Sequence, residues 1–192
     1  MGQLIVIEQF SQGKLAFALE KDLMPLIGER LDELFQTAVQ PRERGLYVVS
    51  ENAGFQSAVQ FWGDARRSGV AVANPELFPW TLANAPCGWL ARHFQVTGPN
   101  YTFTGQSEAL RSALSQAAGD LRAGCVQTAW VVAIDFARKP SGKAAFAALR
   151  LAMASPEMQI EKALDWASGA RLSSTQMLLK QKGAVVGGYL NL

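Results

Sequence analysis

A short segment around residue 107 combines residue types and a spacing that suit nucleophilic chemistry. Residues 101–104 predict a strand, Gly105-Gln106-Ser107 a sharp bend, and residues 108–123 a helix. A strand that bends abruptly into a helix exposes the bend residue and points the first helical N–H groups toward whatever binds there. Residues 105–109 (GQSEA) come close to the GxSxG motif, whose serine attacks an acyl group. Ser107 is therefore a candidate nucleophile for acyl transfer, although the same pattern also occurs as a plain helix cap.

The histidine content limits that chemistry. In GxSxG hydrolases the serine is followed along the chain by an acid and then by a histidine. His93 is the only histidine in the 192 residues, and it lies upstream of the bend on a predicted helix. A hydrolase of that type is disfavoured, and we expect His93 to be an ordinary residue at a helix end.

Metal and cofactor chemistry have no support in the sequence. Cys87 and Cys125 form no CxxC pair and no Cys/His pair of zinc-site spacing, so we expect two buried thiols in a reducing compartment. Gly187-Gly188 lacks the spacing of a phosphate-binding loop. We predict no cofactor and no metal site.

The composition predicts a single folded unit. Hydrophobic residues make up 49% of the chain and charged residues 18%, which excludes a disordered or collagen-like protein. The net charge is +2, so neither nucleic acid nor an anionic membrane is indicated as a partner. No apolar run approaches the ~20 residues of a transmembrane helix, and the N-terminus lacks the pattern of a signal peptide. We expect a soluble, cytoplasmic protein.

Alternating strand and helix patterns place the bend in an α/β fold. Strands are predicted at residues 4–7, 46–49, 101–104, 129–134 and 184–190, and residues 14–19 either pair back on the first strand or continue it. Helices are predicted from Asp22 to before Pro41, at 55–67 with Phe55, Val59 and Trp62 on one face, from Thr81 or Asn84 to Phe94, at 108–123, and at about 143–154 and 157–168. This order predicts a mainly parallel sheet covered by helices on both faces.

Several motifs in the middle of the chain occur in one known family. They are FPWTLANAP at 78–86, Gly88, TGPN at 97–100, the bend at 105–107, RAG at 122–124 and AWVVAID at 129–135, with weaker similarity in VVSENAGF at 48–55. In this order and spacing they resemble the N-terminal half of the β-ketoacyl-acyl-carrier-protein synthases, which have the thiolase fold. The resemblance implies one ketosynthase-N-terminal-like domain over 1–192, with a family-like core at about 45–135 and a divergent helical part at 136–192.

Departures from the family pattern decide the expected function. The family's catalytic cysteine aligns with Ser107, and a serine near pH 7 is a far poorer nucleophile than an activated cysteine. The family's two catalytic histidines and its lysine lie in the C-terminal half, beyond what this chain matches. The resemblance therefore implies a subunit that does not catalyse condensation.

Within the family, such a subunit is the chain length factor, which dimerises with an active ketosynthase and shapes the acyl tunnel. It often has glutamine at the lost cysteine, and here Gln106 is adjacent to the aligned position. Short proteins of this kind also occur in aryl polyene pathways. The expected partners are a full-length ketosynthase and, through the complex, an acyl carrier protein, in type II polyketide, aryl polyene or fatty-acid-like biosynthesis.

The resemblance also indicates tunnel or interface residues, because the strand before the bend pairs across the family's dimer two-fold axis. These residues are Tyr101, Phe103, Gln106, Ser107, Asn84 and Trp89. Two other interpretations stay open: a stand-alone acyltransferase or thioesterase that uses Ser107, and a structural homodimer that binds a carrier protein.

Overall fold

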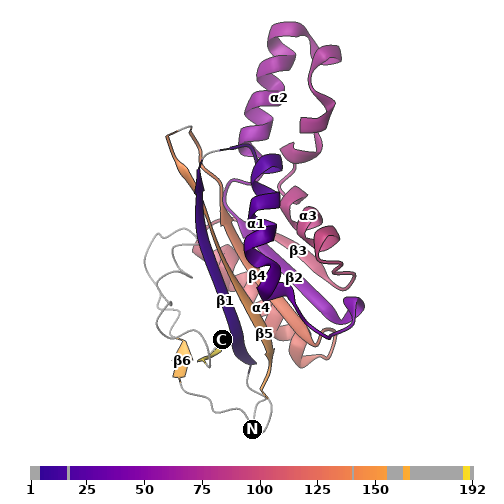
Figure 1. Cartoon of the computed structure of the whole chain (residues 1–192), viewed down its shortest axis with the longest axis vertical. Helices are drawn as coiled ribbons and strands as arrows, with labels where there is room; N and C mark the ends of the chain where they lie inside the picture. The colour runs from indigo at the N-terminus through magenta and orange to yellow at the C-terminus, as the bar shows by residue number, and fades with distance from the viewer. Residues whose placement is uncertain (1–4, 17, 140, 155–161, 165–187, 191–192) are drawn as a thin grey trace.

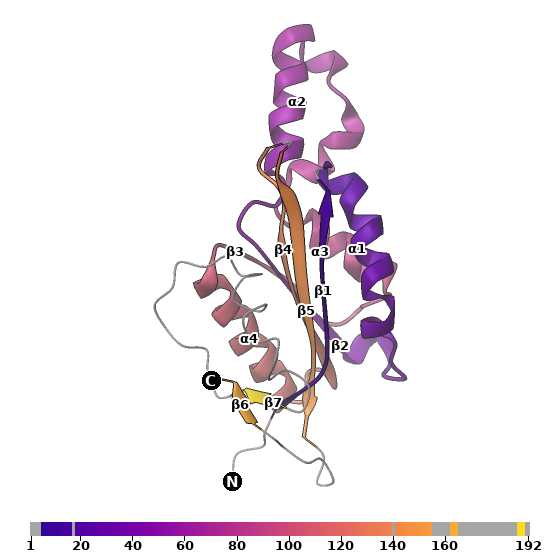
Figure 2. The same ribbon diagram turned by 60° about the vertical axis from the view of Figure 1, so that its left-hand side comes forward.

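The computed structural model describes the chain except for residues 1–4, 17, 140, 155–161, 165–187 and 191–192. Its main elements are β1 (Ile5–Ala16), α1 (Glu20–Phe35), β2 (Arg44–Ser50), α2 (Phe55–Ser68), α3 (Ala85–His93), β3 (Asn100–Thr104), α4 (Ser107–Arg122), β4 (Thr128–Asp135), β5 (Lys143–Met153), β6 (Lys162–Leu164) and β7 (Gly188–Leu190). The strands form one sheet in the order β3-β2-β4-β5-β1-β7-β6. Helix α4 covers one face of this sheet, and α1 and α3 cover the other (Figure 1, Figure 2). The predicted α/β architecture is confirmed.

The strands that carry the family-like motifs pair in parallel. β2 lies between β3 and β4, with Val48 opposite Thr102 on one side and Val132 on the other. β4 is buried along almost its whole length because its side chains alternate between the two helical layers. Val131 packs with the α4 layer, whereas Trp130 packs with the layer of α1 and α3. A strand covered on both faces requires such a continuous apolar sequence.

Residues 143–153 form a strand, so the helix predicted at 143–154 is wrong. β5 pairs antiparallel with both β4 and β1, which makes the sheet mixed, with parallel pairing concentrated in its family-like part. The connection from β4 is too short for a crossover helix, and a bond from Gly142 N–H to Lys139 O helps turn the chain back. Alanines obscured the strand pattern: Ala147 faces the α4 layer and Ala148 the other layer, so both faces of β5 are apolar. Pairing with two neighbouring strands outweighs the high helix propensity of alanine.

Other boundaries differ from the prediction by less. Residues 14–16 continue β1 and do not pair back on it. Helix α1 begins at Glu20, two residues before its predicted start at Asp22. The predicted C-terminal helix at 157–168 is contradicted at Lys162–Leu164, which is strand, and the rest of that range lies outside the described residues. β7 falls within the strand predicted at 184–190, whose first four residues also lie outside the described part.

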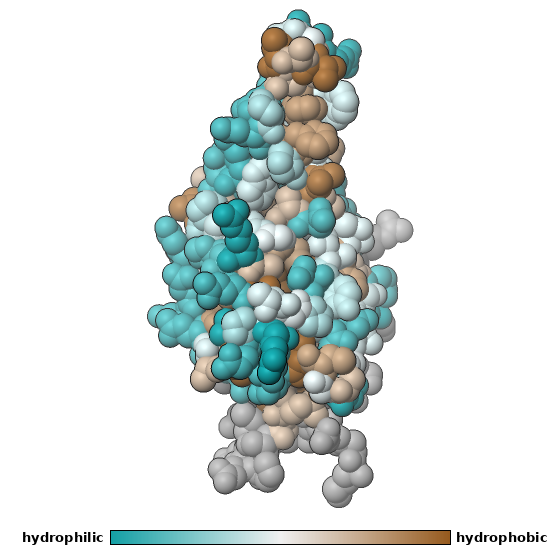
Figure 3. Space-filling view, turned by 90° about the vertical axis from the view of Figure 1, so that its right-hand side faces the viewer, coloured by the Kyte–Doolittle hydropathy of each residue, from teal (hydrophilic) through white to brown (hydrophobic). Residues whose placement is uncertain are grey.

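Helix α2 projects beyond the carboxyl ends of the strands and does not lie on the sheet (Figure 1, Figure 2). Its buried residues include Phe61, which packs with Leu77 in a small cluster apart from the main core. The apolar face predicted for this helix is half exposed, at 50–55%, and consists of Phe55, Val59 and Trp62. Figure 3 shows apolar side chains over this projecting part of the surface. Among the described residues, no helix has both the length and the apolar character of a membrane span.

Candidate functional site

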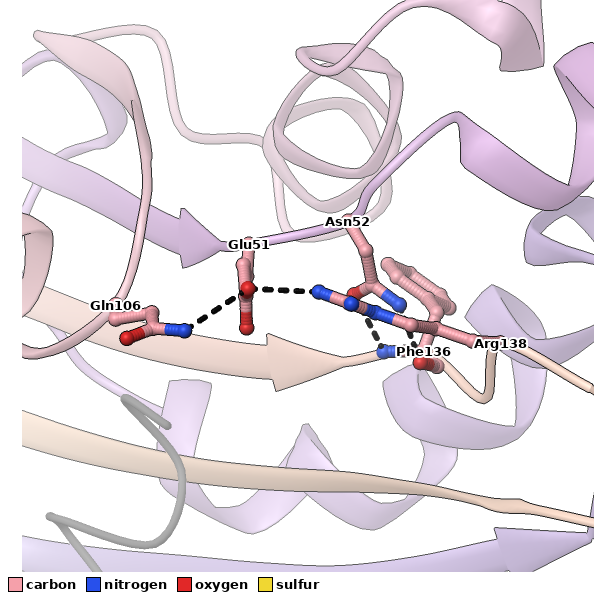
Figure 4. Close-up of polar contacts among 5 residues, drawn as sticks. All are labelled: Glu51, Asn52, Gln106, Phe136 and Arg138. Atoms are coloured by element: carbon pink, nitrogen blue, oxygen red, sulfur yellow. Dashed lines mark hydrogen bonds and ion pairs between the residues drawn. The ribbon is translucent and has the colours of Figure 1, made fainter. Parts of the chain in front are cut away.

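Three polar side chains meet where the three parallel strands end. Glu51 follows β2, Gln106 follows β3 after one glycine, and Arg138 follows β4 on the loop toward β5 (Figure 4). In open α/β sheets, ligands bind at this carboxyl edge. We refer to Glu51, Gln106 and Arg138 as the edge cluster.

Glu51 joins the edge cluster through one carboxylate oxygen. Its Oε1 accepts a hydrogen bond from Gln106 Nε2 at 3.0 Å and lies 2.7 Å from the Arg138 guanidinium (Figure 4). The Arg138 side chain is 60% exposed, so solvent screens the ion pair and limits its contribution to about 1 kcal/mol or less. The contact therefore matters mainly because it connects the ends of all three strands.

Asn52 holds two of these loops together independently of the charges. Its Nδ2 donates to the backbone carbonyl of Phe136, and its Oδ1 accepts from the Phe136 N–H at 3.2 Å (Figure 4). The loop after β2 is thus clasped to the end of β4 by two hydrogen bonds. The edge cluster consequently rests on a framework that a change at Glu51 or Arg138 leaves in place.

Gly105 forms the bend between β3 and α4. Its φ of +140° lies where residues with a side chain are strained, and an added Cβ would come within 3.3 Å of Ala109 Cβ. Its N–H donates to Ser50 O at 3.2 Å, so the bend stays attached to β2 while the chain turns into α4. Ser107 is the first residue of the helix and is half-buried, whereas Gln106 is exposed. The predicted strand, bend and helix are confirmed.

His93 lies on the opposite face of the sheet from Ser107. Its ring stacks on Trp89 with 4.6 Å between centroids, and its Nε2 is 3.8 Å from the Asp32 carboxylate of α1. Because α3 and α4 cover opposite faces, the sheet separates the two residues (Figure 2). His93 therefore cannot act as a base for Ser107 in this chain.

β3 is an edge strand of the sheet that the described strands form. In a parallel ladder, alternate residues direct their backbone groups to opposite sides. Because Gly105 N–H bonds to Ser50 of β2, the odd-numbered residues of β3 face β2. Thr102 and Thr104 consequently direct their backbone N–H and C=O groups to the open edge.

The side chains of Tyr101 and Phe103 lie together on the α4 face, as their alternation predicts. Tyr101 stacks on Tyr47 with 5.7 Å between ring centroids, and Phe103 packs against the core under α4. The hydroxyl of Tyr47 donates to Asp120 at 2.7 Å; burial, together with this carboxylate, raises the pKa of Tyr47 well above its usual value. The aromatic residues of the edge strand therefore pack against buried side chains of β2 and α4.

Asn84 and Trp89, the other two predicted interface residues, lie on α3. Asn84 is exposed at the start of the helix, and its side chain makes no capping bond. Trp89 packs toward α1, where a Cβ added at Gly28 would come within 2.7 Å of its ring. Helix α3 contacts β3 through Cys87, whose thiol donates to Tyr101 O at 3.5 Å and whose pKa burial raises to about 11. The structure thus groups the other four predicted site residues at β3 and its bend, and leaves these two on the opposite face.

A cavity of about 420 Å³ opens beside the edge cluster, between the loop after β2 and the start of α2. Glu51 and Arg138, which contact each other, form the polar end of its lining, and Ala53, Phe55 and Ala58, on the loop and the first turn of α2, form the apolar end. Gly54, at φ +83°, lets the start of α2 approach Thr81, because an added Cβ would come within 2.6 Å of the Thr81 carbonyl oxygen. Within the described ranges, no group of His, Cys, Asp and Glu side chains could hold a metal ion.

Sequence reasoning missed the edge cluster and the cavity. Of these residues, the sequence analysis names only Gln106 as a site residue, and it assigns no role to Glu51, Asn52 or Arg138. The signal was available, since all of them follow strands that the pattern predicts to be parallel, and such strand ends meet at one edge. What the sequence does not contain is the contact of Arg138 with Glu51, which depends on how the β4–β5 turn folds back.

No protein-family model matches the sequence, and no curated protein matches it. Solved structures do match the fold. AntDE:AntF, a type II PKS acyl-carrier protein in complex with its ketosynthase, superposes with a TM-score of 0.64 at 14% identity, over 79% of this chain and 63% of that chain. The ketosynthase ApeO in complex with its chain length factor ApeC, from Xenorhabdus doucetiae, gives 0.57 at 12% identity, over 81% and 59%.

This chain has the ketosynthase fold. A third match, the ketosynthase domain OzmH KS8 of Streptomyces albus JA3453, gives a TM-score of 0.50 at 16% identity, over 79% of this chain and 48% of that domain. The thiolase-like half-fold inferred from the motifs is thereby confirmed. The chain spans less than two thirds of the length of each of these three structures.

Proposed function

We propose that this chain is a non-catalytic ketosynthase-like subunit, an analogue of the chain length factor that pairs with an active ketosynthase and shapes its acyl tunnel. The observation that carries the proposal is that β3 is an open edge strand and leads directly into the bend before α4. An open strand edge with outward backbone groups runs directly into the bend where the family places its nucleophile. In this chain the bend holds Gln106 and Ser107 in place of a cysteine.

The surroundings of Ser107 support a role without condensation chemistry. Condensation in the family needs a thiolate nucleophile and two histidines, and these 192 residues contain one histidine, on α3, across the sheet from Ser107. The match to a complex of a ketosynthase with a chain length factor supports a ketosynthase as the partner of this chain. Type II polyketide, aryl polyene and fatty-acid-like synthesis are the pathways in which we place such a pair, with the acyl carrier protein reached through the complex.

Proline substitution in β3 tests the pairing. Thr102→Pro removes an N–H that faces the open edge, which an edge strand tolerates, so we expect a folded protein that no longer co-purifies with its ketosynthase. Phe103→Pro is the matched control, because it removes an N–H that faces β2 and should destabilise the sheet itself. A folded Thr102→Pro variant that binds the ketosynthase at unchanged affinity would place the interface elsewhere.

The tunnel role and the enzymatic alternative need separate measurements. Phe103→Ala in the assembled complex should alter product chain length while assembly is kept, and an identical product distribution would remove Phe103 from the tunnel. Incubation of the purified chain with an acyl-carrier thioester should leave Ser107 unmodified by mass spectrometry. Stoichiometric acylation of Ser107 would instead favour the stand-alone acyltransferase or thioesterase.

A further inference from the structure

The cavity beside the edge cluster has the size and the position of a small-molecule site. Its volume of about 420 Å³ falls within the ~300–1,000 Å³ range of ligand pockets. It lies at the carboxyl ends of parallel strands, which is where open α/β sheets bind ligands. Its two ends differ in chemistry, so a ligand would bind in a defined orientation.

The polar end keeps hydrogen-bonding capacity that the protein does not use. Arg138 engages Glu51 through one terminal nitrogen, whereas a guanidinium carries five N–H donors. Glu51 uses Oε1 for both of its contacts, which leaves Oε2 as an acceptor without a partner among the described residues. A donor and an acceptor therefore stand side by side at the mouth of the cavity.

The charges at this end select for a neutral ligand. Glu51 and Arg138 already compensate each other, so an anion bound at Arg138 would also meet the carboxylate, and a cation bound at Glu51 would also meet the guanidinium. A neutral group with a carbonyl and an adjacent N–H satisfies both residues without either repulsion. A primary amide has this arrangement, because one of its two N–H bonds lies on the same side as its carbonyl, whereas the N–H of a trans secondary amide points the opposite way.

The apolar end fits an uncharged substituent on that amide. Ala53 and Ala58 offer small side chains that leave room, and the Phe55 ring, which is half exposed, supplies an aromatic surface. Aromatic rings stack favourably on such a surface.

We propose that this cavity binds a small neutral primary amide that carries an apolar group. The amide carbonyl accepts from Arg138, the amide N–H donates to Glu51 Oε2, and the apolar group lies between Ala58 and Phe55. This inference does not depend on the proposed subunit role, because it uses none of the residues of the β3 edge.

The first test measures binding of three probes of similar size, benzamide, benzoate and benzylamine, to the full chain by titration with ligand-observed NMR. We expect saturable binding of the amide and weaker binding of both ions. Ala58→Leu fills the apolar end and should weaken amide binding at least about tenfold, or ~1.4 kcal/mol. Gln60→Leu, which adds the same side chain on the same helix outside the cavity, should leave it unchanged.

The second test uses the charges, because the Asn52 clasp should keep the loops in place when either charge is removed. Glu51→Gln leaves Arg138 uncompensated, so the preferred probe should change to benzoate. Arg138→Met leaves Glu51 uncompensated, and the preference should change to benzylamine. The proposal is overturned if the amide shows no saturable binding up to about 10 mM, because small fragments bind their sites with a Kd of ~1 mM. It is also overturned if Ala58→Leu binds the amide normally, or if the two charge variants prefer the same probe as the unmodified chain.

Discussion

Helices α2 and α4 follow neighbouring parallel strands, yet one is buried by the fold and the other is not. The apolar stripe of α4 is at most 3% exposed and comprises Leu110, Ala113, Leu114, Ala117, Ala118 and Leu121. The stripe of α2, at the same helical spacing, keeps half of its surface in solvent. Both helices begin after a glycine turn with positive φ, at Gly54 and near Gly105.

The direction of each turn explains the difference. The bend at Gly105 sends α4 back along the strands, so that its stripe faces β2 and β4. The turn at Gly54 sends α2 past the strand ends, where the sheet no longer offers a surface (Figure 1). Helical periodicity states which side of a helix is apolar, whereas the turn before it decides whether anything covers that side.

Shortening one side chain in each apolar stripe should give the largest difference between the two helices in the free energy of unfolding. Leu114→Ala on α4 opens a cavity in a fully buried core and should lower the free energy of unfolding by about 2–5 kcal/mol. Val59→Ala on α2 removes atoms that are already half solvated and should change it by about 0.5 kcal/mol or less. Urea unfolding followed by circular dichroism measures both. Equal losses would mean that the α2 stripe is covered in solution.

The anchor of α2 should give the next largest effect. Glu20, fully buried, accepts hydrogen bonds from the N–H groups of Gln56 and Ser57 and from the Ser57 hydroxyl, at 3.1, 3.1 and 2.6 Å. Glu20→Ala leaves these donors buried without acceptors and should cost about 1–3 kcal/mol, with the loss of amide protection concentrated in α2. Asp22→Ala, an exposed carboxylate in the same turn of α1, is the control and should have little effect. Hydrogen exchange that stays unchanged in α2 of Glu20→Ala would rule out the anchoring role.

Two glycines inside the helices should report whether α2 unfolds together with the body of the protein. An added Cβ meets no atom within 4 Å at Gly119 of α4 and only the end of Arg67, at 3.8 Å, at Gly63 of α2. Either substitution to alanine should therefore stabilise its helix by about 0.5–1 kcal/mol. We expect both to raise the urea midpoint, because Glu20 couples α2 to α1. A midpoint raised by Gly119→Ala but not by Gly63→Ala would show that α2 unfolds separately.

Sequence patterns predicted the helices and strands most reliably where the spacing of apolar residues fits only one kind of element. The stripe of α4, the continuous apolar run of β4 and the glycine bend all predicted the observed elements, because each matches a single backbone geometry. β5 was misread, since alternating and helical apolar patterns become indistinguishable when alanine occupies both faces. The motifs from residue 78 to residue 135 compensated for such ambiguity and led to the correct fold.

By itself the sequence determined the strand, bend and helix around Ser107 and the presence of a single histidine, because these depend on residue identity and short-range geometry. Only the tertiary structure decided that His93 and Ser107 lie on opposite faces, that β3 is an edge strand, and that Glu51 meets both Gln106 and Arg138. Those relations join residues 14 to 87 positions apart along the chain. They arise from the order of the strands in the sheet and the path of the connecting turns, which no local pattern of side chains encodes.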